Sequence, residues 1–263
     1  MRKAGTALRR LCMGLFASVA TFGAWACTPV TPDNNLLGYG VYCLDSDLVA
    51  PRDTNTALIL ASNSVLDCRG HKIKDPTLTA VFGVYILTHA RNVVLKNCIF
   101  EGFIQEVYSN SARDVRILNN SFSGAGVIAI FATDTDGLIE GNTFDISGTG
   151  GDVVAINGNG ILDIIGNTIL SAQAPPEASG HTVTGIVASV HGGVIANNII
   201  RNLRGASGGH GLAILAQGPV VISGNVIVNP PGTGDRGIYC RGPTTMVSNV
   251  VMGFATPYLD CPR

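Results

Sequence analysis

Four short segments in the second half of the chain carry a polar side chain next to a glycine. They are Gly151-Asp152-Val153, Thr184-Gly185-Ile186, His210-Gly211-Leu212 and Arg236-Gly237-Ile238. Each has the composition of the start of a β-strand. If these strands stack in successive layers, one face presents a carboxylate, a hydroxyl, an imidazole and a guanidinium. Such a set suits proton transfer at a sugar ring, with Asp152, His210 and Arg236 as candidate catalytic residues.

Other polar residues near these segments are candidates for substrate binding. Three arginines lie in segments expected to form loops that border the face, and one hydroxyl lies within it; the candidates are Thr184, Arg201, Arg204 and Arg241. The alternative is that all these side chains are solvated residues at strand entrances. A shift of one residue in register turns a strand's side chains to the opposite face, so both interpretations stay open.

The segment Asp134-Thr135-Asp136-Gly137 contains two carboxylates, which are ligands that Ca²⁺ prefers. Asp134 and Asp136 are therefore candidate metal ligands, and Ca²⁺ is the candidate cofactor. The same Asp-x-Asp-Gly pattern is also favourable turn chemistry. A purely structural role is the alternative.

An internal repeat indicates which elements position these residues. A phrase such as Ile164-Ile165-Gly166-Asn167-Thr168-Ile169 occurs seven times, with 22 to 31 residues between successive asparagines. Repeats of this length indicate a solenoid, a propeller or an array. Each unit alternates apolar and polar residues and is punctuated by Gly and Asn, which predicts short strands. One such unit cannot bury its apolar face alone, so we expect the coils to stack around a common core.

The recurring asparagines are expected to form a structural column. Asn tolerates the left-handed backbone of a tight corner, and its amide can bond to amides in the layers above and below. We therefore assign a structural role to Asn97, Asn120, Asn142, Asn167, Asn198, Asn225 and Asn249.

These repeats resemble the PbH1-type repeats of right-handed parallel β-helix proteins of the pectate-lyase-like superfamily. Upstream, Gly38-Tyr39-Gly40-Val41-Tyr42-Cys43-Leu44 followed by Val65-Leu66-Asp67-Cys68-Arg69-Gly70-His71-Lys72-Ile73 resembles the opening of such domains. The resemblance covers about residues 36–254. It implies an all-β fold, a single-stranded right-handed parallel β-helix solenoid of about seven or eight coils with short terminal caps.

We expect an N-terminal cap at 27–50, the β-helix at 51–255 and a C-terminal cap at 256–263. Because the superfamily includes lyases, hydrolases, epimerases, adhesins and proteins without known activity, the resemblance specifies the fold and not a reaction.

Two enzymatic alternatives remain open. Gly209-His210-Gly211 with Gly151-Asp152 is similar to motifs of polygalacturonase-like glycoside hydrolases, although the family's Asp doublet is reduced here to Asp152. That resemblance implies hydrolysis between two carboxyl groups. Lyase or epimerase chemistry instead abstracts a proton next to a uronate carboxylate, which requires a base and a cation such as His210 and Arg236.

Residues 1–26 have the pattern of a secretory signal peptide. Four basic residues lie within the first ten, an apolar stretch runs from Leu11 to Trp25, and Ala24-Trp25-Ala26 fits a small-x-small cleavage site. The apolar stretch is too short for a membrane span, and no later stretch is long enough. We expect a soluble periplasmic or secreted protein. A lipid anchor on Cys27 is disfavoured, because Trp25 stands where a lipobox has a small residue.

Six cysteines follow residue 26, and an even number in an exported chain indicates disulfides. Cys68 and Cys98 occupy the same place in neighbouring coils, and a separation of one rung is within disulfide reach. We predict the pairs Cys68–Cys98, Cys27–Cys43 and Cys240–Cys261, the last two at the ends of the solenoid.

Charge and aromatic content limit the partners. After residue 26 the chain holds 13 basic and 18 acidic residues, which argues against a broad basic face for nucleic acid. The single Trp lies before that point, so the sequence gives no sign of a strongly aromatic sugar groove.

The first hypothesis is an exported β-helix that binds or acts on a polysaccharide or cell-surface glycan, with uronates as the expected sugars. The second is a non-catalytic surface-recognition or envelope module. The oligomeric state is not defined by the sequence.

Overall fold

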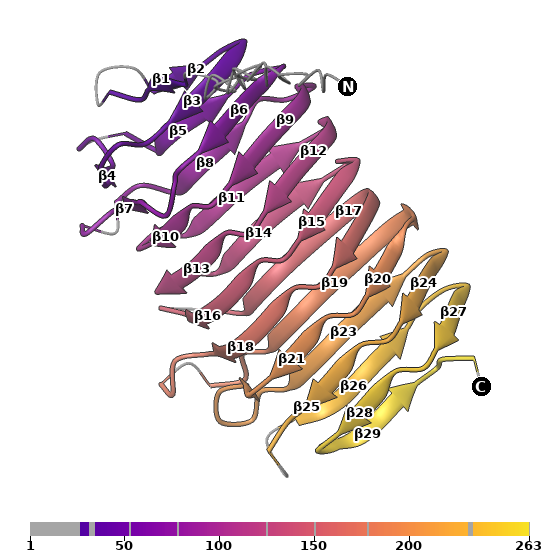
Figure 1. Ribbon diagram of the computed structural model, residues 1–263. Helices are drawn as coiled ribbons and strands as arrows, with labels where there is room; N and C mark the ends of the chain where they lie inside the picture. Colours follow the sequence, from indigo (N-terminus) through magenta and orange to yellow (C-terminus); the bar gives the residue numbers. More distant parts are fainter. Residues whose placement is uncertain are drawn as a thin grey trace, which may run out of the picture.

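The computed structural model describes residues 27–31, 35–52, 54–77, 79–124, 126–149, 151–177, 179–230 and 234–262. In these ranges the chain winds into about 8 stacked turns of parallel strands (Figure 1). No helix occurs in them. The predicted all-β parallel solenoid is confirmed. The predicted signal peptide, residues 1–26, lies outside the described residues.

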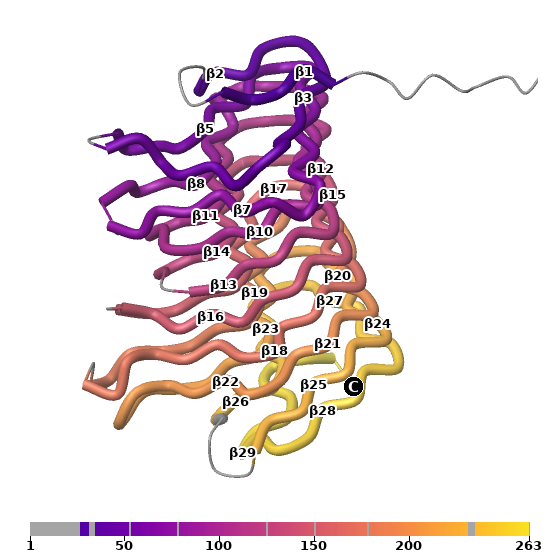
Figure 2. Tube along the Cα trace, turned by 60° about the vertical axis from the view of Figure 1, so that its left-hand side comes forward, coloured from indigo at the N-terminus to yellow at the C-terminus, as the bar shows by residue number. Residues whose placement is uncertain are grey.

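Successive turns contribute strands to three parallel sheets, A, B and C, and Figure 2 shows the turns stacked one upon another. Sheet A contains β1 (Thr28–Pro29), β3 (Gly40–Cys43), β6 (Ser64–Asp67), β9 (Arg91–Lys96), β12 (Arg113–Leu118), β15 (Gly137–Glu140), the second half of β17 (Val153–Ile165), β20 (Val194–Ala196), β24 (Val220–Ser223) and β27 (Thr244–Val247).

Sheet B contains β2 (Leu36–Leu37), β5 (Thr56–Leu60), β8 (Phe82–Ile86), β11 (Gln105–Asn110), β14 (Ile128–Thr133), the first half of β17, β19 (Val183–Gly192), β23 (Gly211–Gln217), β26 (Gly234–Cys240) and β29 (Phe254–Leu259). Sheet C contains β4 (Leu48–Val49), β7 (Lys72–Lys74), β10 (Ile99–Glu101), β13 (Ser121–Gly124), β16 (Thr143–Ser147), β18 (Thr168–Gln173), β21 (Ile199–Arg201), β22 (Leu203–Arg204), β25 (Val226–Val228) and β28 (Val250–Met252).

The core consists of identical positions stacked from turn to turn. In sheet C, Phe100, Phe122 and Phe144 are fully buried, and successive ring centroids lie 5.1 and 4.8 Å apart. Ile169 and Ile200 continue this column towards the C-terminus. The alternation of apolar and polar residues thus places one side of every strand inside the solenoid. Stacked aromatic pairs add about 0.5–1.5 kcal/mol each beyond the area they bury.

The corner between sheets A and C contains the asparagine ladder. Asn120 donates from its backbone N–H and its Nδ2 to Oδ1 of Asn142, at 2.9 and 3.0 Å. Asn142 makes the same bonds to Asn167, and the pattern continues through the column of Asn120, Asn142, Asn167, Asn198, Asn225 and Asn249. Each of these bonds links one turn to the next.

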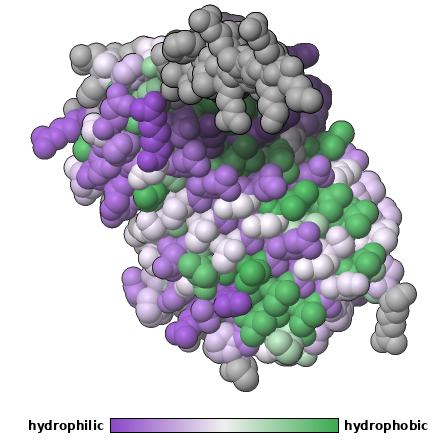
Figure 3. Space-filling model, in the orientation of Figure 1, coloured by the Kyte–Doolittle hydropathy of each residue, from purple (hydrophilic) through white to green (hydrophobic). Residues whose placement is uncertain are grey.

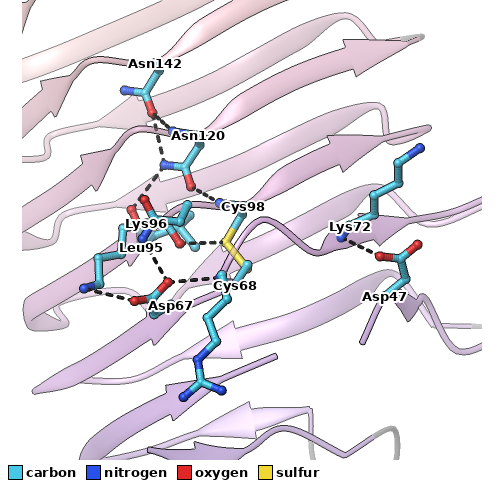
Figure 4. Close-up of a disulfide and its surroundings, with 11 residues drawn as sticks. Asp47, Asp67, Cys68, Lys72, Leu95, Lys96, Cys98, Asn120 and Asn142 are labelled. Carbon is cyan, nitrogen blue, oxygen red and sulfur yellow. Dashed lines mark hydrogen bonds and ion pairs between the residues drawn. A yellow bond between two sulfur atoms is a disulfide. The ribbon is translucent and has the colours of Figure 1, made fainter. Parts of the chain in front are cut away.

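Asn97 is not part of this ladder, which corrects the prediction. The position before Asn120 in the column is Cys98, whose backbone N–H donates to Oδ1 of Asn120 (Figure 4). Asn97 instead belongs to the preceding column, in which every residue has a positive φ: Asn97, Asn119, Gly141, Gly166, Asn197, Gly224 and Ser248. The tight corner therefore requires a left-handed residue directly before the ladder position, and the ladder asparagines serve as hydrogen-bonding groups only.

All three predicted disulfides are confirmed. They are Cys27–Cys43, Cys68–Cys98 and Cys240–Cys261. Cys68–Cys98 joins neighbouring turns at the corner between sheets A and C, as Figure 4 shows. Three disulfides indicate an oxidising, extracytoplasmic environment.

The regions predicted as terminal caps contain sheet strands. β1 to β4 lie within residues 27–50 and pair in parallel with later strands of all three sheets. β29 extends into the predicted tail and pairs with β26. The longer connections run from sheet C to sheet B and include residues 174–177, 179–182 and 205–210. They project along one side of the solenoid (Figure 2).

Candidate ligand-binding face

The structure does not place the four predicted residues in one column. Thr184 and Arg236 share a column, because both are in register with Leu212. Asp152 and His210 each lie two residues before that column, at the edge where the loops from sheet C enter sheet B. Thr184 is also only 6 % exposed, so its hydroxyl is not available to a substrate. Alignment on the flanking glycines fails because these glycines occupy different strand positions: Gly185 and Gly237 are in register with Ala213, whereas Gly211 lies two positions earlier and Gly151 four.

At that loop edge the structure forms two aspartate–histidine pairs. Oδ1 of Asp152 lies 3.3 Å from Nδ1 of His181 and accepts the backbone N–H of Thr182 at 2.7 Å. Nδ1 of His210 contacts the carboxylate of Asp235 in the next turn. A carboxylate on Nδ1 leaves Nε2 as the outer nitrogen, which can accept a proton.

Asp134 and Asp136 have roles in the structure that need no metal ion. Asp136 forms an ion pair with Arg113 and accepts the backbone N–H of Ile161 at 3.0 Å. Asp134 adopts a positive φ of 46° at the turn before β15. Within the described ranges, no three His, Cys, Asp or Glu side chains come together in a group that could hold a metal ion.

A row of aromatic side chains lies on the outer face of sheet B. Tyr85 and Tyr108 stack with their centroids 5.3 Å apart and their planes inclined by 8°. Phe82 and Phe131 lie beside Tyr108 at 5.0 and 5.6 Å, with planes tilted by 45° and 52°. All four rings are half-buried. The sequence contained a signal for this row, because Tyr85, Tyr108 and Phe131 follow one another at the repeat interval of 23 residues.

A column of amides and hydroxyls runs beside the aromatic row. It occupies the strand position two residues after the tyrosine column and consists of half-buried residues: Asn110, Thr133, Asn159, Ser189 and Gln217. Oγ of Ser189 donates to Oε1 of Gln217 at 2.9 Å, which links two turns. The outer face of sheet B therefore offers an apolar strip next to a strip of hydrogen-bonding groups.

Two arginines lie at the C-terminal end of this face. Tyr239 stands in the same column as Tyr85, and the guanidinium carbons of Arg236 and Arg241 lie 5.3 and 4.8 Å from its ring centroid. Both arginines are exposed, and neither has an ion-pair partner among the described residues. Arg201 and Arg204, predicted to border the same face, belong instead to β21 and β22 of sheet C.

Sequence analysis missed one buried charge-bearing group, Glu106 in β11. Its side chain is fully buried, and neither carboxylate oxygen has a hydrogen-bond partner in the described part of the chain. Neighbouring turns carry Gly83 and Ala129 at the corresponding position, which makes room for it. Burial raises the pKa of the Glu106 carboxyl well above its ordinary value. The group is inaccessible to a ligand and therefore acts on stability.

No protein-family model, curated protein or solved structure matches this chain. No helix of the described residues is long and apolar enough to cross a membrane. The fold and the face alone therefore define the class of protein: a disulfide-bonded, extracytoplasmic parallel β-solenoid with an aromatic and amide-rich outer sheet.

Proposed function

We propose that the protein binds a polysaccharide along the outer face of sheet B. The aromatic row beside the column of amides and hydroxyls carries this proposal. Sugars combine apolar C–H surfaces with hydroxyl groups, and aromatic rings supply contact area for the former at low entropic cost. Amide and hydroxyl side chains both donate and accept hydrogen bonds, which suits sugar hydroxyls. Because the face repeats from turn to turn, it fits an extended chain.

Arg236 and Arg241 support an acidic polysaccharide with uronate sugars. The chain after residue 26 has an excess of acidic residues, so attraction to a polyanion requires a local cationic group. Two guanidinium groups held against Tyr239 provide one. Bonds between guanidinium and carboxylate are among the strong hydrogen bonds of proteins. The aromatic row would then bind the apolar surfaces of the sugars, and the arginines a carboxylate.

Binding to a panel of neutral and uronate-containing polysaccharides tests this proposal. We expect Tyr108→Ala to weaken binding about tenfold, equivalent to about 1.4 kcal/mol. Tyr39→Ala is the matched control, because Tyr39 is 85 % exposed and precedes β3 of sheet A. Equal affinities of wild type and Tyr108→Ala would place the ligand elsewhere. A lack of binding across the panel by the folded protein would favour a structural envelope module.

A lyase is the second candidate, because the pair His210–Asp235 is followed directly by Arg236. In such a β-elimination Nε2 of His210 takes the proton from the carbon next to the uronate carboxylate, and Arg236 stabilises the developing negative charge. The glycosidic oxygen on the adjacent carbon then leaves, protonated by solvent water, as the C=C bond forms. Unsaturated products that form with wild type and vanish with His210→Ala would establish this activity. New reducing ends without unsaturation would indicate hydrolysis and direct attention to Asp152. Binding without either product leaves recognition as the function.

The proposal includes export with removal of residues 1–26, for which the three disulfides give support. The mass of the protein, purified from the cells that produce it, tests whether residues 1–26 are removed. We expect a chain that begins at Cys27 and has no lipid attached.

A further inference from the structure

A hollow lies at the corner between sheets B and A, in the three turns that also carry the aromatic row. It has a volume of about 390 Å³ and is lined by His89, Arg91, Ser111, Arg113 and Asp134. These residues lie in the short connections after β8, β11 and β14 or at the starts of β9 and β12. The strands β8, β11 and β14 are those of the aromatic row, so a ligand on that row is next to the hollow.

Hydrogen bonds connect the hollow to the outer face of sheet B. The hydroxyls of Tyr85 and Thr88 lie 3.2 Å apart, and Thr88 directly precedes His89. The hydroxyl of Ser111 donates to Oδ1 of Asn110 at 3.0 Å, and Asn110 belongs to the column of amides and hydroxyls on sheet B. The hollow is therefore continuous with the face that we propose for polysaccharide binding.

The backbone at this corner is unusual in the same three turns. His89, Ser111 and Asp134 have φ values of 63°, 53° and 46°, in the left-handed region that residues other than glycine seldom adopt. Later turns have glycine with a positive φ at this corner, at Gly160 and Gly218. The turns around the hollow thus keep a polar side chain where glycine costs less strain. Residues in such conformations cluster at ligand sites.

Two of the charges around the hollow are not compensated by other charges of the protein. Arg113 forms an ion pair with Asp136, and Asp136 also accepts the backbone N–H of Ile161 at 3.0 Å. Arg91 and Asp134 are exposed, and the side chain of neither has an ion-pair or hydrogen-bond partner among the described residues. The hollow thus presents one available guanidinium and one available carboxylate.

The sequence separates the two signs of charge at this place. No Lys or Arg occurs between Arg116 and Arg201, so the turns that follow Asp134 supply no cation to it. In Figure 3 the strongly hydrophilic surface gathers over the upper turns, which Figure 1 places near the N-terminus, and apolar surface over the lower part. The hollow lies where the last arginine of the earlier turns meets the first carboxylate of the cation-free stretch.

We infer that the hollow binds a zwitterionic part of a glycan, in which a sugar with a carboxylate is next to a sugar with a free ammonium group. Arg91 binds the carboxylate and Asp134 the ammonium group, both through charge-assisted hydrogen bonds. His89 and Ser111 offer further groups for sugar hydroxyls. Arg91 and Asp134 lie two turns apart, about 10 Å along the solenoid, so the two charges of the ligand belong on neighbouring sugars. The inference rests on the proposed function, because the rest of the glycan lies on sheet B.

The charges of the hollow disfavour ligands with one sign of charge only. A chain with a carboxylate on every sugar brings one of them towards Asp134, and like charges repel. A chain of amino sugars brings an ammonium group towards Arg91 for the same reason. Specificity of this kind arises from repulsion of the wrong ligand as well as attraction of the right one.

Calorimetric titration of the oxidised protein with three oligosaccharides of equal length tests this inference. They are de-N-acetylated hyaluronan, which carries alternating carboxylates and amines, hyaluronan, which carries only carboxylates, and chitosan, which carries only amines. The titrations are made at weakly acidic pH, where the amines are protonated. We expect de-N-acetylated hyaluronan to bind about tenfold more tightly than either of the others.

Two variants assign the preference to the hollow. Asp134→Asn keeps a residue that tolerates the left-handed backbone, and it should bind hyaluronan and its de-N-acetylated form equally. Arg91→Gln should bind chitosan and de-N-acetylated hyaluronan equally. Asp145→Asn and Arg201→Gln are the matched controls, because both residues are exposed on sheet C; they should keep the preference of wild type.

Tyr108→Ala separates this inference from the proposed function. Binding that depends on Tyr108 but shows no preference for the zwitterionic chain, or a preference that survives in Asp134→Asn and Arg91→Gln, overturns this inference alone. A preference that depends on Arg91 and Asp134 but not on Tyr108 supports the hollow and contradicts binding along the aromatic row. Failure of the folded protein to bind any of the three chains overturns both.

Discussion

The backbone N–H of Cys98 donates to Oδ1 of Asn120 at 2.9 Å, and Asn120 makes the same bond to Asn142. Cys98 is therefore the first member of the asparagine column, and its disulfide to Cys68 extends that column by one more turn. A covalent bond connects the turns at the N-terminal end of this corner, and side-chain amides connect them along the rest. The corner between sheets A and C is thus cross-linked throughout.

Replacing Asn142 by Ala should lower the free energy of unfolding by about 3 kcal/mol. The change leaves the buried backbone N–H of Asn120 and one of the two Nδ2 hydrogens without an acceptor, while the other Nδ2 hydrogen keeps the carbonyl of Leu95; each unsatisfied buried donor costs about 1–3 kcal/mol. Asn97→Gly is the control, because its φ of 57° suits glycine; we expect a loss of about 1 kcal/mol or less. Urea unfolding measures both values. Similar losses in the two variants would show that the ladder bonds contribute little.

Replacing Glu106 by Gln should stabilise the protein at neutral pH and much less at acid pH. The folded-state pKa is raised above the unfolded value, so the unfolded state ionises first as the pH rises. The contribution of the Glu106 carboxyl to the free energy of unfolding is therefore fully present below the unfolded pKa, about 4.3. It is lost as the pH rises towards the folded pKa. Gln keeps the shape without this loss.

Thermal unfolding of wild type and Glu106→Gln at a series of pH values tests this expectation. The advantage of the variant should grow steadily from pH 4 to pH 7, because the raised pKa of the Glu106 carboxyl makes wild type lose stability over this range. A difference between the two proteins that does not change with pH would contradict the proposed protonated state of Glu106.

Removal of the Cys68–Cys98 disulfide should destabilise the chain by about 2–4 kcal/mol, the usual effect for a native cross-link. The Cys68→Ala/Cys98→Ala variant keeps the backbone N–H of Cys98 that bonds to Asn120. We therefore expect the first turns to exchange amide hydrogens faster while the turns from Asn142 onwards keep their protection. Uniform acceleration along the whole chain would show that the solenoid unfolds as one unit instead.

Binding of a uronate polysaccharide should depend on salt through the arginines at Tyr239. We expect Arg236→Ala and Arg241→Ala each to weaken binding about tenfold at low ionic strength, and the difference from wild type to shrink as salt screens the charge. Arg201→Ala serves as the control, because Arg201 is exposed on sheet C. If it weakens binding as much as Arg236→Ala, the polysaccharide does not follow sheet B.

The sequence by itself determined the repeating architecture and the disulfides. The repeat interval, the alternation of Val and Ile with polar residues, and the common position of Cys68 and Cys98 all express one local requirement, that every turn present the same apolar side to its neighbours. Such a requirement is visible in any single repeat, so it can be recognised before the turns are assembled.

The tertiary structure decided which side chains share a column and which side of a strand faces outwards. Asn97 and Asn120 occur in similar repeat phrases. Only the hydrogen bonds between turns show that the partner of Asn120 in the preceding turn is Cys98 and not Asn97. Asp152 and His210 left the predicted column because loops of unequal length enter sheet B, and their lengths fix the register only after folding. In the sequence, Glu106 has the pattern of an ordinary polar strand residue. Only the stacked turns show that its side chain is buried. Side-chain position in a strand alternates at every residue, so an offset of one changes burial completely.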